Sequence, residues 1–197
     1  GLQQGDQTEY CRGVEGYVNK FTCELNREGT CTVKFQSQCN AILSRRDVEF
    51  QCSGEGSQPS EKSLVVYPIN TIVLDLTDNK LVKLGVKPFH GLNSIRTLHL
   101  ERNSLVALDE DVFHGLAELR SVVLFYNKLA VLPVGVFSGL SLLNKIVLYG
   151  NRLPFVNETT FHGLRELTYI SLGWNNMTTL PVNLFKGVWN LEILYIY

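Results

Sequence analysis

The sequence repeats with a period of 24 residues over most of its length, and this period restricts the fold more than any other feature. Asparagine, phenylalanine and glycine all keep the same step. The recurring residues are Asn79, Asn103, Asn127, Asn151 and Asn175; Phe89, Phe113, Phe137, Phe161 and Phe185; and Gly91, Gly115, Gly139, Gly163 and Gly187. Three residue types that share one period indicate an array of stacked units.

Each position of the unit, LxxLxLxxNxLxxLxxxxFxGLxx, has a physical reason. Its alternating aliphatic residues predict a half-buried strand with the aliphatic side chains turned inward. The asparagine amide both donates and accepts hydrogen bonds, so we expect an internal ladder of amides where the chain leaves each strand. The phenylalanine fills the wide back of each coil, and the glycine permits a tight turn. One coil cannot bury its own face, so the units must stack into one parallel sheet.

This unit resembles the leucine-rich repeat, and the resemblance covers residues from about 64 to 197. It implies an α/β solenoid: a horseshoe with a parallel β-sheet on its concave side and a mostly irregular convex side with short helices. We expect residues 64–197 to hold five repeats and the start of a sixth. Because Leu191, Leu194 and Ile196 begin that sixth strand, we expect the natural protein to continue into further repeats.

Residues 1–63 lack the period and are expected to form an N-terminal cap over the open edge of the solenoid. They contain all five cysteines: Cys11, Cys23, Cys31, Cys39 and Cys52. Their spacing includes no CxxC pair, which disfavours zinc, so we expect a disulfide-bonded cap in an oxidising compartment. An odd number leaves at least one cysteine unpaired within the chain. Sequons at Asn157 and Asn176 predict glycosylation and favour the secretory pathway.

Several classes of function are disfavoured. A net charge of -1 and a pI near 6.5 give no basic excess for nucleic-acid binding. Catalytic, cofactor and metal motifs are missing from the sequence, so we expect no enzyme and no cofactor. His90, His114 and His162 occupy one repeat position, which indicates a structural role. No apolar run reaches the roughly 20 residues of a membrane span, so we expect any anchor to lie outside this sequence.

The outward positions of the strands differ from unit to unit and carry the functional prediction. Early units present acidic and polar residues there, whereas later units present aromatic residues, which binding surfaces favour. Cross-strand packing is the alternative explanation for these rings. The predicted ligand-binding residues are His99, Glu101, Arg102, Phe125, Tyr126, Tyr149, Tyr169, Trp174 and Tyr195.

The 24-residue unit ending in FxGL, the cysteine cap and the sequons resemble two immune groups. One is the Toll-like receptors, and the other is the variable lymphocyte receptors of jawless vertebrates and similar chordate proteins. The enlarged cap favours the first. The resemblance implies an extracellular receptor that binds a protein or microbial ligand through its concave or lateral face and can dimerise. A secreted or lipid-anchored antigen-binding receptor, or an adhesion or matrix protein, is the alternative, because a fold alone does not fix a function.

Overall fold

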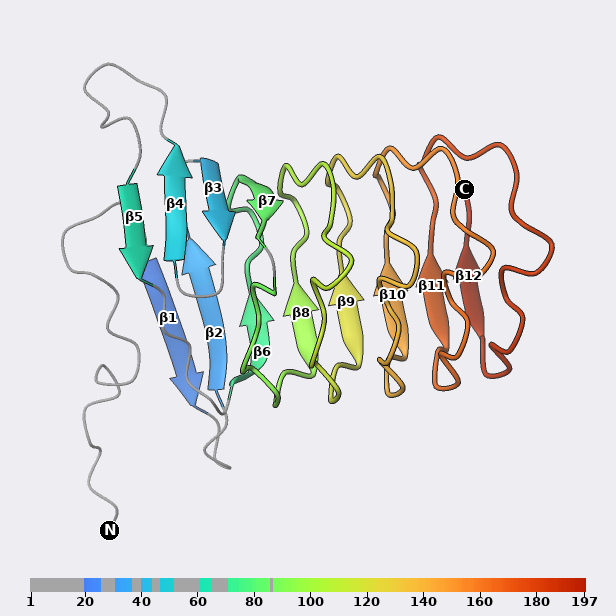
Figure 1. The fold of residues 1–197 in the computed structure, drawn as a ribbon, viewed down its shortest axis with the longest axis horizontal. Helices are drawn as coiled ribbons and strands as arrows, with labels where there is room; N and C mark the ends of the chain where they lie inside the picture. The colour runs from blue at the N-terminus through green and yellow to red at the C-terminus, as the bar shows by residue number, and fades with distance from the viewer. Residues whose placement is uncertain are drawn as a thin grey trace, which may run out of the picture.

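A parallel sheet of very short strands runs along one side of the molecule (Figure 1). The computed structural model describes the backbone of residues 20–25, 31–36, 40–43, 47–51, 61–64, 71–85 and 87–197, and the side chains of the last two ranges. Its parallel strands are β6 (Thr71–Asp75), β8 (Thr97–His99), β9 (Ser121–Val123), β10 (Lys145–Val147), β11 (Tyr169–Ser171) and β12 (Ile193–Tyr195). Equivalent residues of successive repeats pair directly, as Leu98 does with Val122 and Val122 with Ile146. The predicted parallel sheet of stacked units is therefore confirmed.

The N-terminal strands continue the first coil on both of its sides. The concave sheet is extended by β2 (Cys31–Gln36), which pairs with β6, and by β1 (Lys20–Leu25). A second sheet has the order β5-β4-β3-β7. Its strands are β3 (Asn40–Leu43), β4 (Asp47–Gln51), β5 (Glu61–Leu64) and β7 (Leu81–Leu84). Both strands of the first coil, β6 and β7, are thus paired on their outer edges, which exposed edge strands require.

The predicted disulfides fall outside the residues whose side chains the structure describes. Cys11, Cys39 and Cys52 lie outside the described residues, and only the backbone of Cys23 and Cys31 is described. The disulfide pairing and the cap boundary at residue 63 therefore stay predictions.

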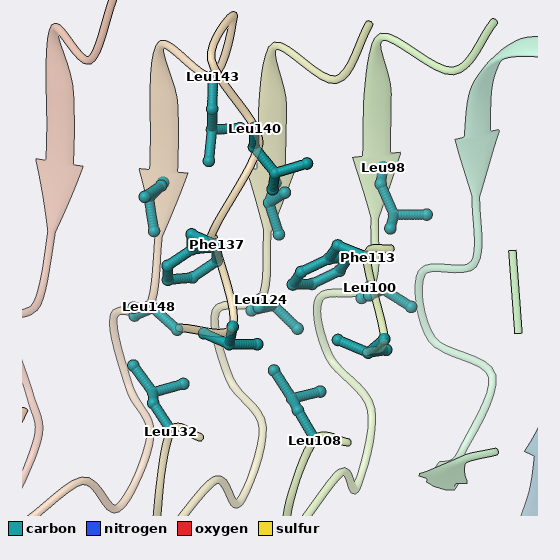
Figure 2. Packing of buried hydrophobic residues seen from close by; sticks show 14 of the residues in the cluster. Leu98, Leu100, Leu108, Phe113, Leu124, Leu132, Phe137, Leu140, Leu143 and Leu148 are labelled. Carbon is teal, nitrogen blue, oxygen red and sulfur yellow. The ribbon is translucent and has the colours of Figure 1, made fainter. Parts of the chain in front are cut away.

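A stack of phenylalanine rings runs through the interior, as Figure 2 shows for Phe113 and Phe137 among the surrounding leucines. The centroids of these two rings lie 5.9 Å apart, with an interplanar angle of 8°. The stack continues to Phe161 at 6.3 Å and to Phe185 at 6.2 Å. Each buried ring stabilises the fold by roughly 1.5–3 kcal/mol, so this stack is a main source of stability.

The ladder asparagines join each coil to the one before it. Asn151 Oδ1 accepts a hydrogen bond from the Leu129 amide at 3.0 Å. Its Nδ2 donates to the carbonyl oxygens of Leu124 at 3.0 Å and Leu148 at 2.9 Å. Equivalent bonds surround Asn103, Asn127 and Asn175. The predicted ladder is confirmed, and it satisfies backbone groups that would otherwise be buried without partners.

The convex side consists of turns, and the expected short helices are absent from the described residues. Every second amide donates to the carbonyl oxygen three residues back, as Val136 does to Pro133, Ser138 to Gly135 and Leu140 to Phe137. Each turn stops at the repeat glycine, for example Gly139 at φ +81°, a conformation that ends a right-handed helix. The described solenoid is therefore built of strands and turns rather than alternating strands and helices. Within the same residues, no helix has the length and hydropathy of a membrane span.

Candidate binding face on the concave sheet

Four aromatic side chains from three adjacent coils form a continuous contact chain on the concave side. Phe125 meets Tyr126 edge-on, with centroids 5.4 Å apart, and Tyr126 meets Tyr149 at 5.5 Å. Tyr149 stacks on Trp174 at 5.8 Å and 28°. Trp174 remains 69% exposed. We call Phe125, Tyr126, Tyr149 and Trp174 the aromatic chain; the structure brings together these residues, which the sequence predicted separately.

Two members of the aromatic chain stand at a conformationally constrained position. The residue before each ladder asparagine has a left-handed backbone, with φ of 52° at Tyr126 and 51° at Trp174. Such a conformation costs roughly 1–2 kcal/mol for a residue with a side chain. The turn buries the next asparagine and leaves the preceding side chain exposed, so a bulky ring here is displayed at the surface.

Gly150 occupies the same position in the coil between Tyr126 and Trp174, and its missing side chain makes room for the aromatic chain. A Cβ added to Gly150 would collide with the Tyr126 ring, whose Cδ1 and Cε1 are the nearest atoms. The ring of Tyr126 therefore lies over Gly150, where it reaches Tyr149. Sequence reasoning missed this role, although a glycine between two aromatic residues in one row is a signal that could have been used.

The environment of the Tyr149 hydroxyl disfavours its ionised form. Burial raises the pKa of Tyr149, and the hydrogen bond and charge of Tyr126 raise it further. The Tyr149 hydroxyl therefore stays neutral at physiological pH. A neutral phenol can donate one hydrogen bond and accept others, so the aromatic chain presents polar atoms beside its rings.

A second aromatic pair continues the face toward β12. The rings of Tyr169 and Tyr195 lie 5.8 Å apart, and Lys145 Nζ lies 5.1 Å from the centroid of the Tyr169 ring. Together with Phe125, Tyr126 and Tyr149 of the aromatic chain, these tyrosines border a hollow of about 380 Å³. The hollow is lined by Phe125, Tyr126, Val147, Tyr149, Tyr169, Ser171, Tyr195 and Tyr197. The sequence interpretation did not select Val147, Ser171 or Tyr197 as site residues.

The predicted polar residues lie nearer the cap and pair with one another. His99 Nδ1 lies 2.9 Å from Glu101 Oε1, and Arg102 Nε lies 3.1 Å from Asp78 Oδ1. The Glu101 hydrogen bond raises the pKa of His99; burial and Lys145 oppose this, while the charges of Glu101 and Asp75 support it. Glu101 is only 8% exposed. This predicted ligand contact is therefore largely covered, and its carboxylate serves His99.

Other outward positions are less accessible than the strand pattern indicated. Val123 and Ser171 are buried, although alternation places them on the concave face. Gly173 is also buried, because the backbone of Tyr197 lies against it. Accessibility on this face is therefore determined by neighbouring parts of the chain as well as by alternation.

The two sequon asparagines are exposed and lie outside the strands. Asn157 begins a convex turn, and Asn176 follows the ladder residue Asn175 near Trp174. Among the described residues, no group of three potential ligands from histidine, cysteine, aspartate and glutamate is arranged to hold a metal ion. Glycosylation at both positions stays a prediction.

A stacked parallel sheet, an asparagine ladder and a phenylalanine stack that repeat every 24 residues define a solenoid repeat protein. The family model described as "Leucine rich repeat" matches residues 70–129 and 117–177, which is more than half of the chain. The chain belongs to the leucine-rich repeat family. Repeats of this kind commonly mediate protein–protein interactions.

Among solved structures, the chain is similar to a leucine-rich-repeat protein of Leptospira interrogans, with 28% identity and a TM-score of 0.58. The match covers 64% of this chain and 31% of the Leptospira protein, so the chain spans about a third of that protein's length. No curated protein matches the sequence.

Proposed function

We propose that this chain is an extracellular recognition module that binds a protein or microbial-surface ligand through the aromatic half of its concave face. The observation that carries the proposal is the aromatic chain, whose rings occupy positions that do not contribute to the repeat's core. Trp174 and Tyr126 are exposed although both pay the cost of a left-handed backbone. Exposed aromatic clusters of this kind commonly mark interaction sites.

The proposed site has the features of an energetic centre of an interface. Tyrosine and tryptophan bury a large area with few rotatable bonds and keep a polar atom for orientation. The hollow beside them is open and apolar, and Lys145 supplies a cation next to Tyr169. A ligand with an apolar projection and a nearby acceptor or acidic group would match this arrangement. Binding alone needs no reaction chemistry, so we propose a receptor rather than an enzyme.

We further propose that the module belongs to an immune-type receptor of the Toll-like kind. The support is the 24-residue unit ending in FxGL, the N-terminal cysteines and the two sequons. The coding sequence 3′ to the Tyr197 codon tests this part. A membrane span followed by a cytoplasmic signalling domain would agree with it. A capped repeat array ending in a stop or a lipid-anchor signal would instead favour a secreted or anchored recognition protein, as in the variable lymphocyte receptors.

The binding face is tested by replacing two of its rings together. A ligand is first selected by screening the whole chain against displayed extracellular proteins and microbial surface preparations. The double substitution Tyr149→Ala with Trp174→Ala should then weaken binding at least about tenfold, as loss of interface aromatics does. Trp189→Ala is the matched control, because Trp189 is 82% exposed but lies in a turn outside the sheet. Unchanged affinity in the folded double variant would place the site on another surface.

A further inference from the structure

A row of exposed apolar residues lies on the segments that follow the ladder asparagines, away from the concave strands. Equivalent positions of three consecutive coils hold Ala107, Val131 and Phe155, and all three are exposed. Phe155 is 60% exposed. The coils are hydrogen-bonded here, since the Arg152 amide donates to the Leu129 carbonyl at 2.9 Å. Neighbouring members of the row therefore lie on adjacent coils, and together they form an apolar stripe.

The stripe ends beside the sequon of Asn157. Val156 is buried, whereas Phe155 and Asn157 on either side of it are exposed. In an extended segment, residues two apart lie on the same side, with α-carbons about 6–7 Å from each other. Phe155 and Asn157 therefore share one outer surface. An aromatic residue also stands two positions before the other sequon, at Trp174, although only a tenth of the residues are aromatic.

The two polar atoms of the Asn157 carboxamide have different roles: Oδ1 is bonded within the fold, and Nδ2 is not used by the turn. Its Oδ1 accepts hydrogen bonds from the Thr159 amide at 2.9 Å and the Thr159 hydroxyl at 2.7 Å. Asp109 caps the equivalent turn two coils earlier in the same way, accepting from the Asp111 amide at 3.0 Å. The turn thus needs only the oxygen. The Asn157 Nδ2, which is the atom that carries an N-linked sugar, is not used by the turn.

We infer that Asn157 carries an N-linked glycan whose first sugar stacks on the Phe155 ring and covers the apolar stripe toward Val131. In the transfer, Nδ2 forms a bond to C1 of N-acetylglucosamine and loses a proton. The lipid diphosphate of a polyprenyl-linked oligosaccharide donor leaves. The apolar face of the sugar then packs on the exposed ring, which removes that ring from water. This inference rests on the extracellular location proposed above.

The occupant of the stripe is thus the chain's own glycan rather than a protein partner. A glycan at this point leaves the concave face open, because Asn157 lies in a convex turn. Asn176 differs: the ring before it, Trp174, already stacks on Tyr149 with one of its faces. We therefore assign the stacked glycan to Asn157.

The test compares glycosylated and deglycosylated forms of the whole chain secreted from eukaryotic cells, in a Thr178→Ala background that removes the second sequon. Peptide N-glycosidase converts Asn157 to aspartate, which can still cap the turn as Asp109 does. Glycopeptide mass analysis should show occupied Asn157. Deglycosylation should then lower Tm by roughly 2–4 °C, and this shift should largely disappear when Phe155→Ala is added. In NMR spectra, sugar protons should be shifted upfield by the ring, and the shift should be lost in Phe155→Ala.

An unoccupied Asn157, or an equal Tm shift with and without the Phe155 ring, would overturn the inference. Neither result affects the binding proposal, because the concave-face test uses Tyr149 and Trp174. Conversely, a stacked glycan found together with unchanged affinity in the concave double variant would sink only the binding proposal.

Discussion

The interior of the coils and the concave face use the same 24-residue step in opposite ways. Interior positions repeat one residue type, as the ladder asparagines and stacked phenylalanines do. Concave positions change from coil to coil, from paired charges near the cap to aromatic rings toward β12. Each interior group contacts the coil before or after it, so a change there damages two coils. Exposed concave side chains, such as Trp174, lie outside the core and can vary without that penalty.

The concave face has a polar part and an aromatic part, which differ in the contacts that their side chains make. In the polar part, Arg102 pairs with Asp78 and His99 with Glu101, so these charges already have partners within the chain. In the aromatic part, rings touch one another by edge or face and retain exposed area. Stability and recognition are therefore assigned to separate residues, and substitutions should distinguish them.

The largest expected effect is at the phenylalanine stack. Phe137 is buried and lies between Phe113 and Phe161, so Phe137→Ala leaves a cavity and should lower the free energy of unfolding by about 3–5 kcal/mol. Urea denaturation followed by circular dichroism measures this loss. Trp189→Ala removes a larger but exposed ring and should change stability by less than about 0.5 kcal/mol. Equal losses would contradict the division between interior and surface.

The ladder should come next. Asn151→Ala removes the acceptor of the Leu129 amide and leaves that amide buried without a partner. It also removes one of two donors to each of the Leu124 and Leu148 carbonyl oxygens, which keep their bonds from Asn127 and Asn175. We expect a loss of about 1–3 kcal/mol, together with faster hydrogen exchange of the Leu129 amide. Asn176→Ala is the matched control, since Asn176 is the next asparagine but is exposed. If Asn151→Ala were as mild as the control, the ladder would not hold the coils together.

Alanine substitutions at two glycines distinguish the effect of backbone strain from an effect on the arrangement of the aromatic chain. Gly139 and Gly150 both have positive φ, so alanine at either should cost about 1–2 kcal/mol. A new Cβ meets nothing within 4 Å at Gly139, whereas at Gly150 it meets the Tyr126 ring. Near-ultraviolet circular dichroism should therefore change for Gly150→Ala and stay constant for Gly139→Ala. The same spectral change in both variants would show that Gly150 does not position Tyr126.

The sequence predicted the interior because the interior is periodic. A residue type that recurs at one position, such as the ladder asparagine, indicates its own environment, and both the parallel sheet and the ladder were predicted in this way. The convex turns were less predictable. Isolated turns, each closed by a hydrogen bond from an amide to the carbonyl oxygen three residues earlier, have sequence patterns similar to those of short helices. The turns were distinguished only by how their bonds are arranged and by the glycine that ends them.

The concave face was predictable in outline but not in contacts. Alternation identified which side chains point outward, and composition identified the aromatic half. The passage of Tyr126 over Gly150 depends on side-chain size in a neighbouring coil, 24 residues away. The pairing of His99 with Glu101 depends on the rotamers of two side chains within one coil. One sequence has no periodic signal for either contact.

The smallest expected effect is a pH dependence in the polar part of the concave face. The Glu101 hydrogen bond raises the pKa of His99 above its ordinary value of 6.5, with Asp75 adding to the shift and burial and Lys145 opposing it. The folded state therefore favours protonated His99. Its contribution is complete below about pH 6.5 and is lost as the pH rises through the raised, folded-state pKa.

We expect this contribution to be less than about 1 kcal/mol, because the pair is partly exposed to solvent. Urea denaturation at about pH 5.5 and about pH 8.5 should show it, and an NMR titration of the imidazole should give the raised pKa directly. Glu101→Gln should abolish the difference, whereas Glu110→Gln, an exposed change in a convex turn, should leave it intact. A pH dependence that persists in the Glu101→Gln variant would mean that His99 and Glu101 do not pair with one another as charges. The contrast with the open aromatic half would then be lost.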